Sequence, residues 1–265
     1  MHLSAENYYS DAANWEYLSV SQYKDFMGSL GRPACEAQAI AKLRGEWEMA
    51  QTTSLLVGSY VDAHFEGTLD LFKAKHPEIF TKSGDLKAEY RKVNEIIHRF
   101  ERDSLLMDAM SGEKQVIFTG EIGGAKWKCK LDSYLPGKAI VDLKVMKSLS
   151  DHFWVHDMGD LDFVTYWGYD MQAAVYQELV RQNTGVQLPF YIAAISKESE
   201  PDIVLAGFTQ QELDDRLSEI NSNVPKILAL KKGEIEAIRC EHCDYCRHTK
   251  VLREPVHHSE LVNAI

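Results

Sequence analysis

The sequence predicts an α/β fold in which one mixed β-sheet carries helices on its faces. The first observation is the order of the segments along the chain. Segments with the helical spacing of apolar residues precede three strand-like segments within residues 115–146. A helix, two strands and a last helix follow. Size is the second, because 265 residues that are 45% hydrophobic can bury one sizeable core. No repeat, low-complexity tract or long linker divides the chain. We therefore expect one domain at residues 18–250, an extended arm at 1–17 and a polar tail at 251–265.

Helices are expected before the first strand at about residues 19–27, 35–51, 55–75 and 84–110. Ser19 or Ser21 can cap the first of these, and the Thr-Thr-Ser run at 52–54 can cap the third. The glycine- and proline-containing segment 28–33 separates the first helix from the second, which begins at Cys35. The segment 84–110 has the pattern of a helix that packs against a core.

Strands are expected at residues 115–121, 127–134 and 139–145, with turns at Gly123-Gly124 and Pro136-Gly137. A loop at 147–159, a helix at 166–183 and strands at 188–196 and 203–208 follow. Thr209 and Glu212 form a capping box that begins a helix reaching about residue 232. Side chains alternate along a strand, so Asp142 and Lys144 are expected on one face of theirs, with Val141, Leu143 and Val145 on the other.

Charge and hydropathy narrow the class of protein. A net charge of −11 and a pI of about 5.4 argue, taken alone, against a nucleic-acid binder. The charge is unevenly distributed, however: residues 122–148 hold only two acids but six lysines, at 126, 128, 130, 138, 144 and 147. Such a basic strip could hold a polyanion or could be a solvated hairpin. The sequence contains no run of 18 apolar residues, so it predicts no membrane span. The N-terminus has no secretion-signal pattern, so we expect a cytoplasmic protein.

Asp132, Asp142 and Lys144 carry the functional prediction. Two carboxylates and a lysine on adjacent strands suit metal-assisted hydrolysis of a phosphodiester, because carboxylate oxygens and a main-chain carbonyl such as that of Leu143 are ligands for Mg²⁺. Lys144 could orient or deprotonate the attacking water, or offset charge on the phosphate. A structural ion pair between Asp142 and Lys144 is the alternative interpretation.

The loop at 147–159 contains an unusual group of aromatic and imidazole side chains: His152, Phe153, Trp154 and His156. Aromatic side chains beside a basic strip can stack on bases. They can equally pack within the protein.

Four blocks of sequence, in this order, resemble the PD-(D/E)xK nuclease superfamily in its RecB/RecE-like exonuclease branch. They are LSVSQ at 18–22 with Cys35, GSYVDAHFE at 58–66, Asp132 with VDLK at 141–144, and YDMQAAVY at 169–176. Together with the C-terminal cysteines they extend over residues 18–246. The resemblance implies a restriction-endonuclease-like fold, a mixed central sheet flanked by helices.

The resemblance also implies roles for particular residues. Asp132 and Asp142 would be metal ligands, with His64 as a third ligand and the Leu143 carbonyl as a fourth; this chain has Asp where many members have Glu. Lys144, Asp132 and Asp142 would be the catalytic residues. Further residues would contact DNA or support the site: Gln172, Tyr176, Tyr169, Lys147, Trp154 and Glu66, with Glu66 and Glu121 as candidates near a second metal.

The similarity is greatest to phage-type, exodeoxyribonuclease VIII-like (RecE-like) enzymes. It implies a Mg²⁺-dependent (or Mn²⁺-dependent) exonuclease that degrades linear duplex DNA 5′-to-3′ and leaves a 3′ single strand for recombination. It further implies a phage or prophage origin, a RecT-like single-strand annealing protein as partner, and a ring-shaped homo-oligomer around DNA. The alternatives are a structure-specific endonuclease of the same fold and a non-catalytic DNA-binding recombination scaffold.

Cys240, Cys243 and Cys246 form a C-x2-C-x2-C run, and Cys35 could complete a site of four thiolates. Some members of the superfamily bind a [4Fe-4S] cluster through one N-terminal and three C-terminal cysteines, although the last spacing here is shorter than theirs. Zn²⁺, with His242 or His248 in the shell, is an alternative, and a metal-free set of reduced cysteines is another. Cys129 is expected to be a small buried residue.

Overall fold

A computed structural model describes residues 2–255, 257 and 258. Its central sheet has the order β3-β4-β7-β8. The strand β4 (Ala139–Met146) pairs antiparallel with β3 (Ser133–Leu135) and parallel with β7 (Phe190–Ser196), and β7 pairs antiparallel with β8 (Ile203–Gly207). Two hairpins accompany this sheet, β1 (Val116–Ile122) with β2 (Ala125–Leu131), and β5 (Phe153–Val155) with β6 (Gly159–Leu161). The mixed α/β sheet expected from the sequence is confirmed.

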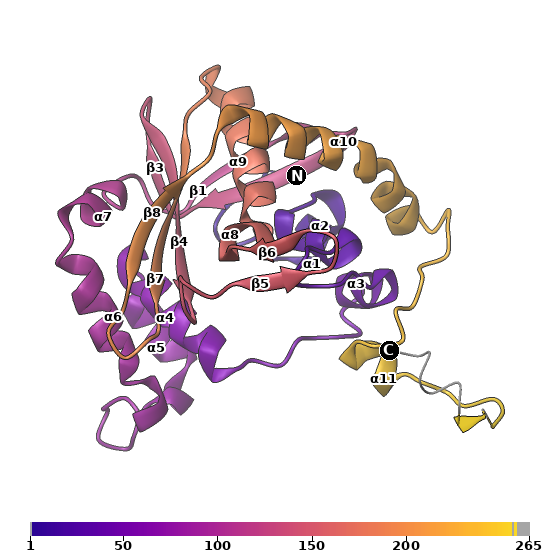
Figure 1. Cartoon of the computed structure of the whole chain (residues 1–265), viewed down its shortest axis with the longest axis horizontal. Helices are drawn as coiled ribbons and strands as arrows, with labels where there is room; N and C mark the ends of the chain where they lie inside the picture. The colour runs from indigo at the N-terminus through magenta and orange to yellow at the C-terminus, as the bar shows by residue number, and fades with distance from the viewer. Residues whose placement is uncertain (1, 256, 259–265) are drawn as a thin grey trace.

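Helices cover the two faces of the sheet, as Figure 1 shows. One face packs against α9 (Tyr169–Thr184), and the core on this side also includes α10 (Gln210–Lys232), α2 (Val20–Met27) and α3 (Glu36–Leu43). The other packs against α4 (Thr53–Glu66), α6 (Lys92–Glu101) and α7 (Ser104–Ala109). Ile140 belongs to the first core, while Val141 and Leu143 belong to the second, so β4 alternates between the two as predicted. None of the described helices is long and apolar enough to span a bilayer.

The N-terminal segment is not the extended arm expected. It contains α1 (Asp11–Glu16), and Leu3, Tyr8, Ala13 and Tyr17 form a small buried cluster. Leu18 then lies beside β2, where its amide donates to the Lys126 carbonyl at 2.8 Å. The segment is ordered because it buries aromatic side chains against the hairpin, a contact that local patterns do not reveal.

Several expected elements are shorter or divided. The segment 55–75 forms α4 and α5 (Leu69–Lys75), separated by Gly67 in the left-handed conformation. The segment 84–110 forms α6 and α7, because Asp103 accepts a hydrogen bond from the Leu106 amide and begins a new helix. The second helix ends at Leu43 rather than near residue 51, and the expected strand 127–134 is divided at Asp132.

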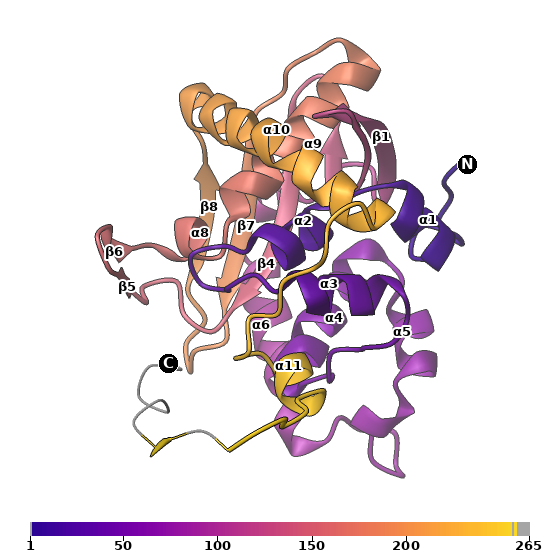
Figure 2. The same ribbon diagram turned by 90° about the vertical axis from the view of Figure 1, so that its right-hand side faces the viewer.

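The loop expected at 147–159 contains the β5–β6 hairpin, which projects from the body of the protein in Figure 2. The remaining short elements are α8 (Phe163–Tyr166), α11 (Asp244–His248) and the 3-10 helices η1 (Pro77–Ile79) and η2 (Ala88–Tyr90). The N-caps at Ser19 and Thr52 and the capping box of Thr209 and Glu212 form as predicted. Residues 256 and 259–265 of the expected tail lie outside the described residues.

Candidate active site

A pocket of about 640 Å³ lies where the end of β2, the middle of β4 and the helices α2, α4 and α9 meet. The carboxylates of Asp132 and Asp142 line it together with Lys144. Asp142 and Lys144 are neighbours on one face of β4, and the break between β2 and β3 places Asp132 beside them. The three residues that define the sequence motif therefore share one pocket.

Main-chain and side-chain hydrogen bonds hold the two aspartates in place. Asp132 Oδ2 accepts the amide hydrogen of Leu143 at 2.9 Å, and this bond ties the break after β2 to the centre of β4. Asp142 is 4% exposed, and its Oδ1 accepts a hydrogen bond from the Gln172 side-chain amide. The ammonium of Lys144 is ion-paired with Asp142 Oδ2.

The helix α4 adds two more carboxylates. Asp62 and Glu66 lie one helical turn apart, so they share a face of α4, and both line the pocket. Glu66 also accepts hydrogen bonds from the side chains of Gln115 and Thr68. Asp62 was not among the residues singled out from the sequence. Its signal was the four-residue spacing from Glu66, which places both side chains on the same side of the helix.

His64 is not part of this group. Two residues along an α-helix correspond to a rotation of about 200°, so His64 faces away from Asp62. Its Nε2 lies 2.8 Å from Glu101 Oε1 on α6, and its side chain is 31% exposed. The geometry therefore does not support the interpretation of His64 as a ligand beside Asp132 and Asp142. Asp62 and Glu66 are the α4 residues that line the pocket.

Burial and mutual repulsion change the acidity of these groups. Burial, reinforced by the charges of Asp142 and Glu66, raises the pKa of Asp62 to about 7. Burial and the neighbouring Asp142 also raise the pKa of Asp132 well above its usual value. Burial alone would lower the pKa of Lys144, but Asp142, Tyr169 and Asp132 outweigh it, so the net direction is upward. The lysine is therefore a firmly protonated cation within a group of carboxylates.

This set of donors fits a divalent cation of the Mg²⁺ type. Such ions take oxygen ligands, and the carboxylates of Asp62, Asp132 and Asp142 all line this one pocket. An ion placed among Asp62, Asp132 and Asp142 would also relieve the repulsion that raises the pKa of the first two residues. Leu143 lines the same pocket.

The helix α9 provides aromatic and amide side chains near Lys144. The Lys144 ammonium lies 5.1 Å from the centre of the Tyr169 ring, whose hydroxyl contacts the Met146 sulfur. Tyr176 lines the pocket next to Gln172. Gln172 is bound to Asp142 rather than to the lysine, so its present role is to orient a carboxylate.

Cations line the other walls of the pocket: Lys24, Arg32, Lys42, Lys128 and Lys130. Burial lowers the pKa of Lys24 and of Lys128, each to about 8, with the positive charge of Lys144 adding to the effect at Lys24. Tyr8 and Tyr9 of the N-terminal segment lie over Lys130, with ring centres 5.6 and 4.8 Å from its ammonium. The contribution of α2, α3 and the N-terminal segment was not expected from the sequence.

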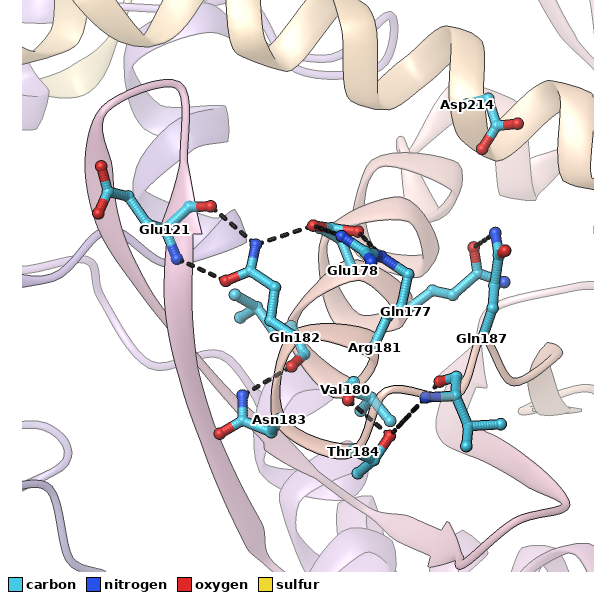
Figure 3. A network of polar contacts seen from close by, with 12 residues as sticks. Glu121, Gln177, Glu178, Val180, Arg181, Gln182, Asn183, Thr184, Gln187 and Asp214 are labelled. Atoms are coloured by element: carbon cyan, nitrogen blue, oxygen red, sulfur yellow. Dashed lines mark hydrogen bonds and ion pairs between the residues drawn. The ribbon is translucent and has the colours of Figure 1, made fainter.

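Three other residues singled out from the sequence are absent from the lining of this pocket. Lys147 is exposed at the end of β4, and Trp154 is 73% exposed on β5. Glu121 lies on β1, where its main chain exchanges hydrogen bonds with the Gln182 side chain (Figure 3). Glu121 is therefore fixed to α9 at the hairpin rather than near the pocket carboxylates.

A second group of chemically reactive side chains lies apart from this pocket. The structure brings Cys35 together with Cys240, Cys243 and Cys246, and the four sulfur atoms lie within 4.8 Å of one another. Cys129, in contrast, is fully buried on β2 within the core. The four cysteines that the sequence grouped are thus brought together, and neither His242 nor His248 belongs to the group of ligand atoms found among the described residues.

Comparison with known proteins shows the family to which the chain belongs. Residues 19–249 match a family described as a PDDEXK-like domain of unknown function (DUF3799). The structure is similar to the crystal structure of a protein from Eubacterium rectale described as a candidate exonuclease, with 57% sequence identity, a TM-score of 0.96 and 100% of both chains covered. A search of curated proteins finds no match.

Proposed function

Since this chain belongs to the PDDEXK-like domain family and is a nuclease, we propose that it is a Mg²⁺- or Mn²⁺-dependent exonuclease acting on the ends of duplex DNA. One observation carries the proposal: the side chains of Asp62, Asp132, Asp142 and Lys144 converge in a single pocket. A structural ion pair alone would not require two further carboxylates at the same place.

Asp132 and Asp142 would hold the metal ion, with Asp62 as a third carboxylate and the Leu143 carbonyl as a further oxygen. When bound, the ion supplies positive charge that polarises a phosphate and lowers the pKa of a water molecule. The hydrogen bonds from the Leu143 amide and the Gln172 side chain fix the two aspartates before any ion arrives. The site is therefore organised in advance.

Lys144 acts in this proposal as a cation and not as a general base. A base needs a pKa near the working pH, whereas the raised pKa of Lys144 keeps its proton in place. A protonated lysine beside the metal ligands can donate to a phosphate oxygen and offset the charge that grows on it. The ring of Tyr169 limits where its ammonium can move.

The cations on the other walls would hold the DNA backbone. Lys24, Arg32, Lys42 and Lys130 line the same pocket as the carboxylates, so a phosphate could approach despite the net charge of −11. Tyr8 and Tyr9 offer ring faces on which an unpaired base could stack. Tyr176 would support the helix α9 face from which Gln172 projects.

The finer features of the proposal rest on the resemblance to RecE-like enzymes. They are 5′-to-3′ degradation that leaves a 3′ strand, recombination by strand annealing with a RecT-like partner, a ring-shaped oligomer and a phage or prophage origin in the bacterial cytoplasm. Polarity can be measured directly by labelling each end of a linear duplex.

Incubation of the protein with matched linear and closed circular duplexes, with and without Mg²⁺, tests the proposed activity. We expect Mg²⁺-dependent loss of the linear DNA only. Lys144→Ala should abolish cleavage, while Lys138→Ala, which removes an exposed lysine at the other end of β4, should not. Equal cutting of circles would indicate an endonuclease, and binding without cleavage would indicate a scaffold.

A further inference from the structure

The four-cysteine site lies where two distant parts of the chain meet. Cys35 is the residue before α3, and Cys240, Cys243 and Cys246 belong to the segment that follows α10 and enters α11. Cys35 and Cys246 are buried, and the other two are half-buried. Figure 2 shows α11 at the end of an extended segment that leaves α10.

Four thiolates can bind either one Zn²⁺ ion or a [4Fe-4S] cluster, and the distances between the sulfur atoms distinguish these two centres. Zinc binds thiolates at about 2.3 Å in a tetrahedron, so the sulfurs of a zinc site lie about 3.8 Å apart. Here the sulfurs of Cys35 and Cys246 are 3.6 Å apart, those of Cys240 and Cys246 are 3.9 Å apart, and all four lie within 4.8 Å. In a [4Fe-4S] cluster each thiolate binds a different iron, so the four sulfurs surround a larger body and lie further apart.

Main-chain amides are also directed at the sulfurs. Cys240 Sγ accepts from the amides of His242 at 3.4 Å and Cys243 at 3.3 Å. Cys243 Sγ accepts from the Cys246 amide, and Cys35 Sγ from the Gln38 amide, both at 3.4 Å. N–H donors of this kind stabilise thiolates, which are the form that binds metal. Glu241, a non-glycine residue with φ of 62°, makes the tight turn that brings two of these amides to Cys240.

The surrounding side chains close the site. The Arg239 guanidinium donates to the Cys246 carbonyl at 2.7 Å and lies over the Tyr245 ring, so a positive charge is held near the cysteines. The Trp47 ring contacts both Tyr245 and His248, with ring centres 5.6 and 5.5 Å away. His248 is thus engaged in ring packing. Among the described residues, the group of possible metal-ligand atoms at this site consists of the four cysteine sulfurs.

From the compact tetrahedral spacing and the amide donors, we infer that Cys35, Cys240, Cys243 and Cys246 bind one Zn²⁺ ion and not an iron–sulfur cluster. The ion has a structural role, because four protein ligands leave no open position for a substrate. It joins the C-terminal segment to α3, whose Lys42 is ion-paired with Asp25 in the wall of the active-site pocket. The inference does not depend on the proposed nuclease activity.

Metal analysis of the full chain tests this inference. The protein is purified anaerobically from cells supplied with both zinc and iron, and its metals, visible spectrum and free thiols are measured. We expect one zinc per chain, negligible iron and no visible chromophore. A brown protein with about four irons per chain would overturn the inference, and so would metal-free protein, with or without disulfides among these cysteines.

Variants locate the ion. Cys243→Ser should lose the zinc, whereas Cys129→Ala, which removes the buried cysteine outside the group, should retain it in full. Retention of stoichiometric zinc by Cys243→Ser would contradict the assignment. Because a cysteine variant can fail to fold, the parent protein provides a second test. Replacement of its zinc by Co²⁺ should give the intense visible bands of a tetrahedral thiolate site, and the absence of those bands would overturn the proposal.

Discussion

The active-site pocket and the four-cysteine site both gather ligand atoms from distant segments, but they are built in opposite ways. In the pocket, hydrogen bonds from the Leu143 amide and Gln172 hold the aspartates in place without an ion. The cysteines instead lie on a short segment at the edge of the fold, and the ion itself would connect that segment to α3. A pre-organised oxygen site can exchange its ion during turnover, whereas a thiolate site of this kind couples metal binding to folding.

The largest expected effect is on nuclease activity, and it should differ between substitutions of Asp62 and of its neighbour His64. Asp62→Asn should reduce nuclease activity by at least about 100-fold, because the change removes a charge that faces the proposed metal position. His64→Asn is the matched control, since it alters the other side of the same helix and removes a half-exposed contact with Glu101 and a ring contact with Phe65. Initial rates on a linear duplex with saturating Mg²⁺ would measure both.

Loss of activity in His64→Asn with retention in Asp62→Asn would restore His64 as the ligand and contradict the geometry described above. The fold of each variant can be verified by thermal unfolding. Because exposed ion pairs contribute about 0–1 kcal/mol, the His64 variant should unfold within a few degrees of the parent.

Removal of the two metals should have different consequences. Withdrawal of Mg²⁺ with a mild chelator should stop cleavage and leave the melting temperature nearly unchanged. Removal of zinc should destabilise the protein; a loss of about 2 kcal/mol corresponds to a decrease of about 4–8 °C in melting temperature. Limited proteolysis should then cut within residues 233–249, because their attachment to α3 is weakened.

If zinc removal leaves both the melting temperature and the proteolysis pattern unchanged, the ion does not hold the C-terminal segment on α3. The cysteines would then be a packing feature, and α3 would depend on its remaining contacts with the C-terminal segment. One of these is the hydrogen bond from the Ala37 amide to the Ile238 carbonyl at 3.1 Å, and another is that from the Ile238 amide to Glu36 at 2.9 Å.

The carboxylates should make the metal-free protein less stable as pH rises. The pKa of Asp62 is about 7 in the folded protein and 3.8 for the unperturbed side chain, so between these values the folded state binds more protons than the unfolded state. The free energy of unfolding therefore falls as pH increases from about 4 to 7. Asp132, whose pKa is also raised, contributes in the same direction.

Urea unfolding at a series of pH values in the presence of a Mg²⁺ chelator would measure this effect. Asp62→Asn should flatten the pH dependence, and its stability relative to the parent should be greater at pH 8 than at pH 4. Mg²⁺ should restore stability to the parent at pH 8. A parent protein whose stability rises over this range would show that the carboxylates are not desolvated in solution.

Sequence patterns predict some residues of the pocket and of the cysteine site, but not all of them. The alternation along β4 placed Asp142 and Lys144 on one face, and the cysteine spacing grouped Cys240, Cys243 and Cys246, to which the family resemblance added Cys35. On α4 the sequence reading chose His64 as a candidate ligand, whereas the structure places Asp62, two residues earlier, in the lining of the pocket. The packing of the N-terminal segment was also missed: Tyr8 meets Lys128 across 120 residues, and local patterns carry no record of such a contact.

The smallest expected effect tests whether the DNA surface extends beyond the pocket to the β5–β6 hairpin. Trp154 is 73% exposed there, so Trp154→Ala should leave stability within about 0.5 kcal/mol of the parent. If the ring stacks on a base, affinity should fall by about 1 kcal/mol or more, roughly fivefold.

Binding of a labelled duplex can be measured by fluorescence anisotropy with Ca²⁺ in place of Mg²⁺. Met158→Ala, at the tip of the same hairpin and 53% exposed, is the matched control. Equal binding by the parent and both variants would confine DNA recognition to the pocket, where Lys24, Lys42 and Lys130 line the approach to the carboxylates.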